Sequence, residues 1–124
     1  WGLTIPGYEY VNAQRVRREF TEQVLSAFER FDVLAWPTCQ KVAEPIADLR
    51  TGGFRYTALT APWNHTGLPV LTVPCGFGAR GLPVGLSLAA RPFEEAIACQ
   101  VGAALESATP ELRGVPPGAG RRGS

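Results

Sequence analysis

Apolar residues recur every three or four positions across residues 8–31. They are Ala13, Val16, Phe20, Val24, Ala27, Phe28 and Phe31. This spacing predicts an amphipathic helix with one apolar face. The opposite face carries the charged residues Arg15, Arg18, Glu19, Glu22 and Glu29. Because oppositely charged residues stand four positions apart on that face, we interpret it as a solvated surface rather than a binding site.

A short apolar run follows this helix. It reads DVLAWPT at residues 32–38 and ends around Pro37, which suits a buried strand and is too short for a helix. Residues 39–55 show no sustained period and contain proline and a glycine pair, so we expect a connecting loop. The next segment, residues 56–67, has room for about one or two helical turns.

Two more apolar runs of strand length follow, LPVLTVPCGF at residues 68–77 and LPVGLSLAAR at residues 82–91. The glycine-containing connection GARG separates them, so this region predicts an antiparallel hairpin. A second helix is then predicted to start at Pro92 and to stop at Thr109-Pro110. Its apolar face is formed by Ile97, Val101, Leu105 and Ala108.

These elements predict an α/β fold of two main helices and about three strands, including an antiparallel hairpin. They are too few to cover both faces and both edges of a sheet, so we expect their partners to precede this chain. The chain starts with Trp1 and lacks methionine, which also predicts a piece of a longer protein. Residues 110–124 are expected to form a disordered tail, rich in glycine, proline and arginine from Gly114 onward.

Charge and composition exclude several classes of protein. The chain has 12 basic and 11 acidic residues with no basic patch, so no nucleic-acid partner is expected. No apolar run is long enough to span a membrane, and no signal peptide is visible. Cys39, Cys75 and Cys99 lie far apart, which favours reduced thiols and a cytoplasmic protein. The preference for arginine over lysine is typical of a GC-rich bacterial genome.

The reactive side chains do not form a known catalytic pattern. His65 is the only histidine, and it shares the stretch APWNHTGLPVLTVPCG with Cys75. No serine lies in a GxSxG elbow, and the histidine and cysteines lack the spacing of a metal site. The glycine cluster GFGARG leads into a strand instead of a helix. We therefore predict no catalytic residue, metal or cofactor, and interpret His65 and Cys75 as packing or surface residues.

Three phrases, in order, carry a family resemblance: AQRVRREFTEQVLSAFERFDVLAWPT, YTALTAPWNHTGLPVLTVPCG and GLPVGLSLAARPFEEA. They resemble the C-terminal third of the amidase signature family. That family shows "D-v-l-l-x-P-T", then "f-T-x-p-x-N-x-x-G-l-P-a-x-s-v-P-x-G", then "l-P-v-G-x-q". The resemblance covers roughly residues 8–106. It implies a partial α/β/α amidase-signature fold around a mixed sheet, with residues 1–109 as the C-terminal portion of an amidase domain.

The resemblance also implies a mechanism, amide hydrolysis by a serine that a lysine activates through a second serine. In the family, these residues and the glycine- and serine-rich oxyanion loop lie upstream of this region. Here the only lysine, Lys41, falls in the loop after the first predicted strand, and no two serines are adjacent. We therefore expect the chain to lack the catalytic triad and to be inactive alone.

Candidate substrate contacts follow from the same resemblance. It places Thr57, Thr60 and Trp63 on the short element where related enzymes contact the acyl or side-chain part of the substrate. The amidotransferase members of the family have an acidic residue at the position of Thr57, which helps to hold the amino group of glutamine, so a more general amidase is favoured here. Asn64 and Gly67 are expected to shape the turn into the next strand.

Two hypotheses remain. In the first, the chain is the C-terminal part of an amidase whose partner is a small-molecule amide substrate of the full-length enzyme, with a homodimer left open. In the second, it is a non-catalytic binding or interaction module that pairs its open sheet edge with another chain.

Overall fold

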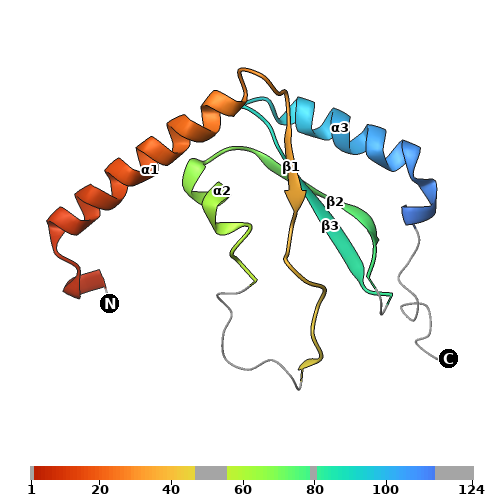
Figure 1. Cartoon of the computed structure of the whole chain (residues 1–124), viewed down its shortest axis with the longest axis horizontal. Helices are drawn as coiled ribbons and strands as arrows, with labels where there is room; N and C mark the ends of the chain where they lie inside the picture. Colours follow the sequence, from red (N-terminus) through yellow and green to blue (C-terminus); the bar gives the residue numbers. More distant parts are fainter. Residues whose placement is uncertain (1, 47–55, 79–80, 114–124) are drawn as a thin grey trace.

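The computed structural model describes residues 2–46, 56–78 and 81–113 (Figure 1). Its elements are η1 (Gly2–Thr4), α1 (Gly7–Ala27), β1 (Leu34–Pro37), α2 (Ala61–Thr66), β2 (Val70–Phe77), β3 (Pro83–Ala89), α3 (Glu95–Ala108) and η4 (Pro110–Arg113). The two long helices and the hairpin confirm the predicted α/β arrangement. Over these residues no helix is both long and apolar enough to cross a membrane.

The three strands form one antiparallel sheet in the order β1-β3-β2, so β3 is central. Ser87 of β3 lies opposite Trp36 of β1 and Thr72 of β2. The hairpin register is irregular between Pro74 and Gly76. The sequence patterns identified each strand but not the place of β1 beside β3, because that pairing joins segments far apart in the chain.

Helix α3 packs on one face of the sheet through its smallest residues. Ala98 and Gly102 are its buried positions. A Cβ atom added to Gly102 would lie 2.7 Å from Leu71 Cδ2 and 3.2 Å from Val73 Cγ1. The absence of a side chain at this glycine therefore allows the helix to approach β2 closely.

Two details of the predicted second helix are wrong. It begins at Glu95 instead of Pro92. Phe93 has φ 65°, a left-handed conformation that a right-handed helix does not continue through, so the preceding residues form a turn. The apolar face also differs, because Val101 is 39% exposed while the small residues named above make the contact with the sheet.

The main cluster of buried residues consists of Phe28, Leu68 and Ala89. Partly buried residues pack against it, namely Val24, Leu25, Leu34, Trp36 and Trp63. These residues come from the C-terminal end of α1, from β1, from β3 and from the α2 region. In Figure 1, α1 and α2 accordingly lie on one side of the strands and α3 on the other.

Arg91 joins the end of β3 to the chain segment that follows α1. Its guanidinium donates hydrogen bonds to the carbonyl oxygen of Phe28 and, at 3.4 Å, to that of Phe31. It also lies 3.6 Å from Asp32 and 3.3 Å from Glu94 in ion pairs. One side chain thus satisfies carbonyl groups that the end of a helix leaves without partners.

The N-terminal part of α1 projects away from the sheet (Figure 1), and the helix contains no buried residue. Val16 is 65% exposed and Phe20 is 36% exposed. The polar side of the helix instead lines a groove of about 380 Å³ against α2, formed by Gln14, Arg17, Arg18, Thr21, Glu22, His65 and Thr66. Two residues of the predicted solvated face, Arg18 and Glu22, line this groove, and all five residues of that face are exposed. Much of the apolar side is exposed as well.

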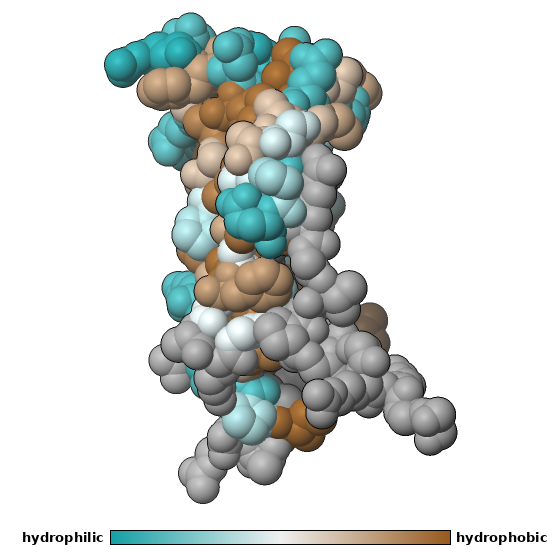
Figure 2. Space-filling view, turned by 90° about the vertical axis from the view of Figure 1, so that its right-hand side faces the viewer, coloured by the Kyte–Doolittle hydropathy of each residue, from teal (hydrophilic) through white to brown (hydrophobic). Residues whose placement is uncertain are grey.

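The remaining segments agree in part with their predictions. Residues 39–45 contain no helix or strand, as expected for a loop, whereas residues 47–55 lie outside the described residues. Pro110–Arg113, predicted to belong to a disordered tail, forms η4 and contacts β2 and α3. Residues 114–124 are outside the described part. Seen from the side of Figure 2, hydrophobic and hydrophilic residues are interspersed over the surface.

Candidate functional site

Two tryptophans from separate elements stack on each other. The ring centroids of Trp36 in β1 and Trp63 in α2 are 3.9 Å apart, with 15° between the planes. Trp36 Nε1 donates a hydrogen bond to the carbonyl oxygen of Leu59 at 3.0 Å. Both rings are half-buried and pack against the cluster around Phe28. The segment before α2 is therefore tied to the first strand at two points.

Two predicted substrate contacts, Thr57 and Thr60, lie on the turn that leads into α2, and the third, Trp63, lies in α2 itself. The backbone N–H groups of Thr60 and Ala61 donate to the carbonyl of Thr57 at 3.0 Å and 2.7 Å. The Thr60 hydroxyl donates to the same oxygen at 3.3 Å. Thr57 is exposed, whereas Thr60 and Trp63 are half-buried. The structure thus brings the three residues together in one segment, and their contact with substrate stays a prediction.

Gly67 ends α2 and turns the chain toward β2. Its φ of 73° and ψ of 15° are left-handed, and its N–H donates to the Trp63 carbonyl at 3.2 Å. The hydroxyl of Thr66 donates to that same carbonyl at 2.8 Å. The expectation that this glycine supplies a positive φ is confirmed, and Trp63 is held by its backbone as well as by its ring.

His65 and Cys75 lie on different elements. His65 is exposed on α2, where its carbonyl oxygen accepts a hydrogen bond from Arg17 Nε at 2.5 Å. Cys75 is half-buried on β2. Among the described residues, no group of three histidine, cysteine, aspartate or glutamate side chains is placed to hold a metal ion.

A hydroxyl cluster at the centre of the sheet was missed by sequence reasoning. Ser87 is 1% exposed, and its Oγ lies 2.7 Å from Thr38 Oγ1 and 3.2 Å from Thr72 Oγ1. A serine in an otherwise apolar, buried strand indicates that its hydroxyl has a hydrogen-bond partner, and this was the signal in the sequence. A nucleophilic serine needs a neighbouring base, and both partners of Ser87 are hydroxyls. Among the described residues the cluster therefore links β3 to β2 and to the residue that follows β1.

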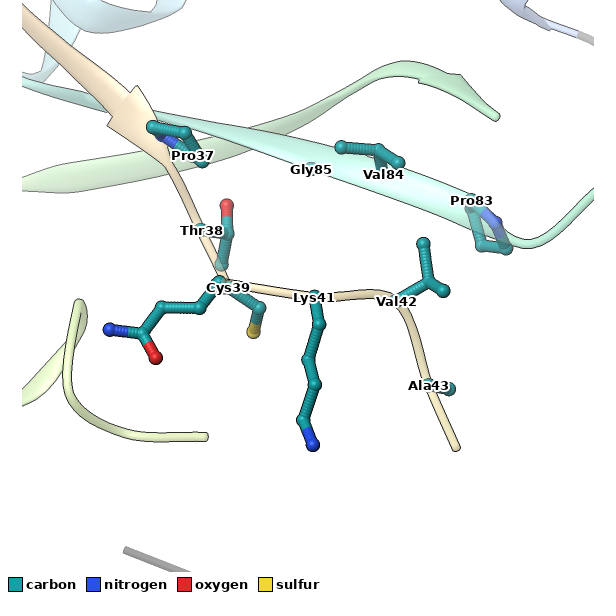
Figure 3. A pocket seen from close by; sticks show the side chains of 10 residues that line it. Pro37, Thr38, Cys39, Lys41, Val42, Ala43, Pro83, Val84 and Gly85 are labelled. Carbon is teal, nitrogen blue, oxygen red and sulfur yellow. The ribbon is translucent and has the colours of Figure 1, made fainter. Parts of the chain in front are cut away.

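An open pocket of about 450 Å³ lies beside the end of β1 (Figure 3). It is lined by residues 37–43 and 83–85. Lys41 points away from β3 in this view and forms an ion pair with Glu44, and its Nζ lies 5.4 Å from the centre of the Tyr56 ring. The only lysine of the chain therefore contacts a carboxylate and an aromatic ring, and we assign it a structural role.

These features define a class of protein, an α/β fold in which α3 packs on one face of an antiparallel sheet and a short helical segment on the other side is held against the edge strand β1. Two solved structures share the arrangement. A glutamyl-tRNA(Gln) amidotransferase subunit from Thermotoga maritima is 28% identical with a TM-score of 0.72, covering 79% of this chain and 22% of that chain. The 6-aminohexanoate cyclic dimer hydrolase is 25% identical with a TM-score of 0.80, covering 91% and 27%.

The chain belongs to the amidase family, whose model, described as Amidase, matches residues 5–99. A curated relative, the corresponding glutamyl-tRNA(Gln) amidotransferase subunit from Roseiflexus sp. strain RS-1, is 42% identical over 103 residues. The match covers 81% of this chain and 21% of that protein. The chain thus spans about a fifth of the length of the curated relatives it matches.

Proposed function

We propose that this chain is the C-terminal portion of an amidase that hydrolyses carbon–nitrogen amide bonds, with residues 1–109 belonging to the amidase domain. The observation that carries the proposal is the family match over residues 5–99 in a chain that spans about a fifth of its relatives. In this proposal the serine–serine–lysine residues come from an earlier part of the polypeptide, and this chain supplies sheet core and one wall of the substrate pocket.

The exposed apolar side of α1 supports this division of roles. Val16 and Phe20 are accessible to solvent, while Gln14, Arg17 and other polar residues of the same helix line the groove against α2. Apolar surface of this kind gains stability when another part of a protein covers it. In this proposal the earlier part of the amidase domain covers the apolar side of α1.

The test compares the 124-residue chain with the complete protein that contains it. Both are assayed for release of ammonia or amine from a panel of small primary and secondary amides. We expect hydrolysis by the complete protein alone, and its loss when the lysine and serines of the earlier part are replaced. Hydrolysis by the isolated chain, or none by the complete protein, would overturn the proposal.

The substrate class is proposed from Thr57. An acidic residue at this position would attract an amino group, and threonine has no charge with which to do so. We therefore propose a small amide without a neighbouring ammonium group, handled in the cytoplasm of a bacterium. A second candidate is glutamine, because a curated relative at 42% identity is named as an amidotransferase subunit.

The two candidates are separated by replacing Thr57 with aspartate in the complete protein. A new carboxylate beside the bound amino group would strengthen glutamine binding by about tenfold or more, as expected for a charged hydrogen bond. Thr57→Asn is the matched control, since asparagine has the shape of aspartate without its charge. If the unsubstituted protein already prefers glutamine to uncharged amides, the second candidate replaces the first.

A further inference from the structure

We propose that Trp36 is a positioning residue for the substrate pocket of the proposed amidase, an inference that rests on the proposed function above. It lies on β1 and does not belong to the segment that holds the candidate substrate contacts. Its side chain makes a hydrogen bond and a ring stack that both reach that segment. Trp36 would therefore act on substrate through other residues.

The hydrogen bond holds the backbone between the two candidate threonines. Trp36 Nε1 donates to the carbonyl of Leu59 at 3.0 Å, and Leu59 stands immediately before Thr60 and two residues after Thr57. The bond is part-buried and joins residues 23 positions apart. The hydrogen bonds from Thr60 and Ala61 to Thr57 stay within the turn, whereas the bond from Trp36 reaches it from β1.

The ring stack holds the other end of the same segment. The indole of Trp36 lies almost parallel to that of Trp63, with centroids 3.9 Å apart. Both rings pack against the buried cluster of Phe28, Leu68 and Ala89, so the pair cannot shift without disturbing the core. A wall built on the turn before α2 therefore takes its position from β1, next to which α2 lies in Figure 1.

Both tryptophans stand at positions that the family pattern leaves open. Trp36 occupies the x of "D-v-l-l-x-P-T", and Trp63 occupies the x between proline and asparagine of the next phrase. The stacked pair therefore joins two of the phrases that carry the resemblance. We infer that it tunes where the pocket wall stands, and thereby which amides fit.

The experiment uses the complete protein with Trp36→Phe and Trp36→Leu. Phenylalanine keeps an aromatic ring for Trp63 but cannot donate to Leu59, and leucine loses both contacts. We expect KM to rise by about three- to tenfold in Trp36→Phe, the equivalent of one lost hydrogen bond. The rise should be larger in Trp36→Leu, and kcat should change by less than about twofold in both variants.

A KM effect separates positioning from a purely structural role. A residue that only stabilises the fold would lower the active fraction, and so kcat per mole of protein, at unchanged KM. Ultraviolet circular dichroism gives a second readout, because two stacked indoles produce an exciton couplet. The couplet should disappear in both Trp36 variants and persist in the control Trp1→Phe, which removes a tryptophan outside the pair.

The possible failures are distinguishable. If the unsubstituted protein hydrolyses no amide, the proposed function and this inference fall together. If it is active and both Trp36 variants keep its KM, only the positioning role is overturned. A couplet that survives both Trp36 substitutions would overturn the stacked geometry itself.

Discussion

The direction of the chain after α2 depends on the conformation of one residue, Gly67. Its φ of 73° lies in the left-handed region, and a Cβ added there would meet no atom within 4 Å. A substitution at this position therefore tests backbone strain without steric overlap. We expect Gly67→Ala to lower the free energy of unfolding by about 1–2 kcal/mol, the cost of this conformation for an L-residue.

Asparagine provides the control at the same position. It tolerates the left-handed conformation better than alanine, so Gly67→Asn should recover part of the lost stability. Urea denaturation of the three proteins measures the difference. Equal losses for alanine and asparagine would show that strain at φ is not the cause.

At the same scale, sequence reasoning identified residues with local signals and missed those defined by long-range contacts. The positive φ at Gly67 was predictable, because helix ends select glycine through local geometry. The partners of Ser87 were not, since Thr72 reaches it from β2 and Thr38 from the residue that follows β1. The stack of Trp36 on Trp63 could not be predicted either, because no local sequence pattern indicates that these two residues meet.

Between elements, the contact of α3 with β2 depends on the small size of Gly102. Gly102→Val would introduce a branched side chain where even a Cβ lies 2.7 Å from Leu71 Cδ2. We expect a loss of about 1–3 kcal/mol in the free energy of unfolding, typical of overpacking. Ala103→Val is the matched control on the exposed side of the same helix, with an expected cost of about 0.5 kcal/mol from helix propensity.

The two valine variants are compared by denaturant unfolding under identical conditions. Helix propensity alone would make Gly102→Val neutral or slightly stabilising and Ala103→Val destabilising, so a larger loss for Gly102→Val is due to packing. Similar losses for Gly102→Val and Ala103→Val would contradict the close packing of this helix on the sheet.

A second contact between elements depends on Arg91, which connects the end of β3 to the carbonyls of Phe28 and Phe31. We expect Arg91→Gln to lower the free energy of unfolding by about 1–2 kcal/mol, because these carbonyls lose a charged donor. The ion pair with Asp32 should contribute little, since that carboxylate is 85% exposed.

Arg30→Gln tests whether loss of charge alone explains the effect. Arg30 is exposed and lies 5.5 Å from the centre of the Phe31 ring, so its replacement should cost no more than about 0.5 kcal/mol. Both variants are measured by urea denaturation. A cost for Arg91→Gln as small as that of the control would mean that the carbonyls find water instead.

The elements themselves were largely predictable from the sequence, because helix and hairpin periods are local properties. The start of α3 was not, since the left-handed Phe93 delays the helix that Pro92 was expected to open. Nor was the central position of β3, which depends on pairing with β1 across more than 40 residues. Local pattern identifies an element, whereas tertiary contacts decide its bounds and neighbours.

On the scale of the whole molecule, the orientation of α1 is the feature that the chain itself does not explain. The apolar stripe predicted to face a core is exposed at Val16 and Phe20, while the polar side borders α2. A helix of a finished domain normally turns its apolar side inward. The proposed amidase would account for the exposure, because this chain spans about a fifth of the relatives' length and an earlier part of the domain would cover the stripe.

In the complete protein, a lysine on the apolar side of α1 should therefore lower the free energy of unfolding much more than a lysine on its polar side. Val16→Lys would place a charge in the proposed interface and should lower the free energy of unfolding by about 2–4 kcal/mol, because an unpaired charge is costly to bury. Gln14→Lys introduces the same residue on the side of the open groove and should cost no more than about 0.5 kcal/mol. Denaturant unfolding of both variants measures the contrast. If the two substitutions cost the same, the stripe faces water in the complete protein, and the division of the amidase domain proposed for this chain is wrong.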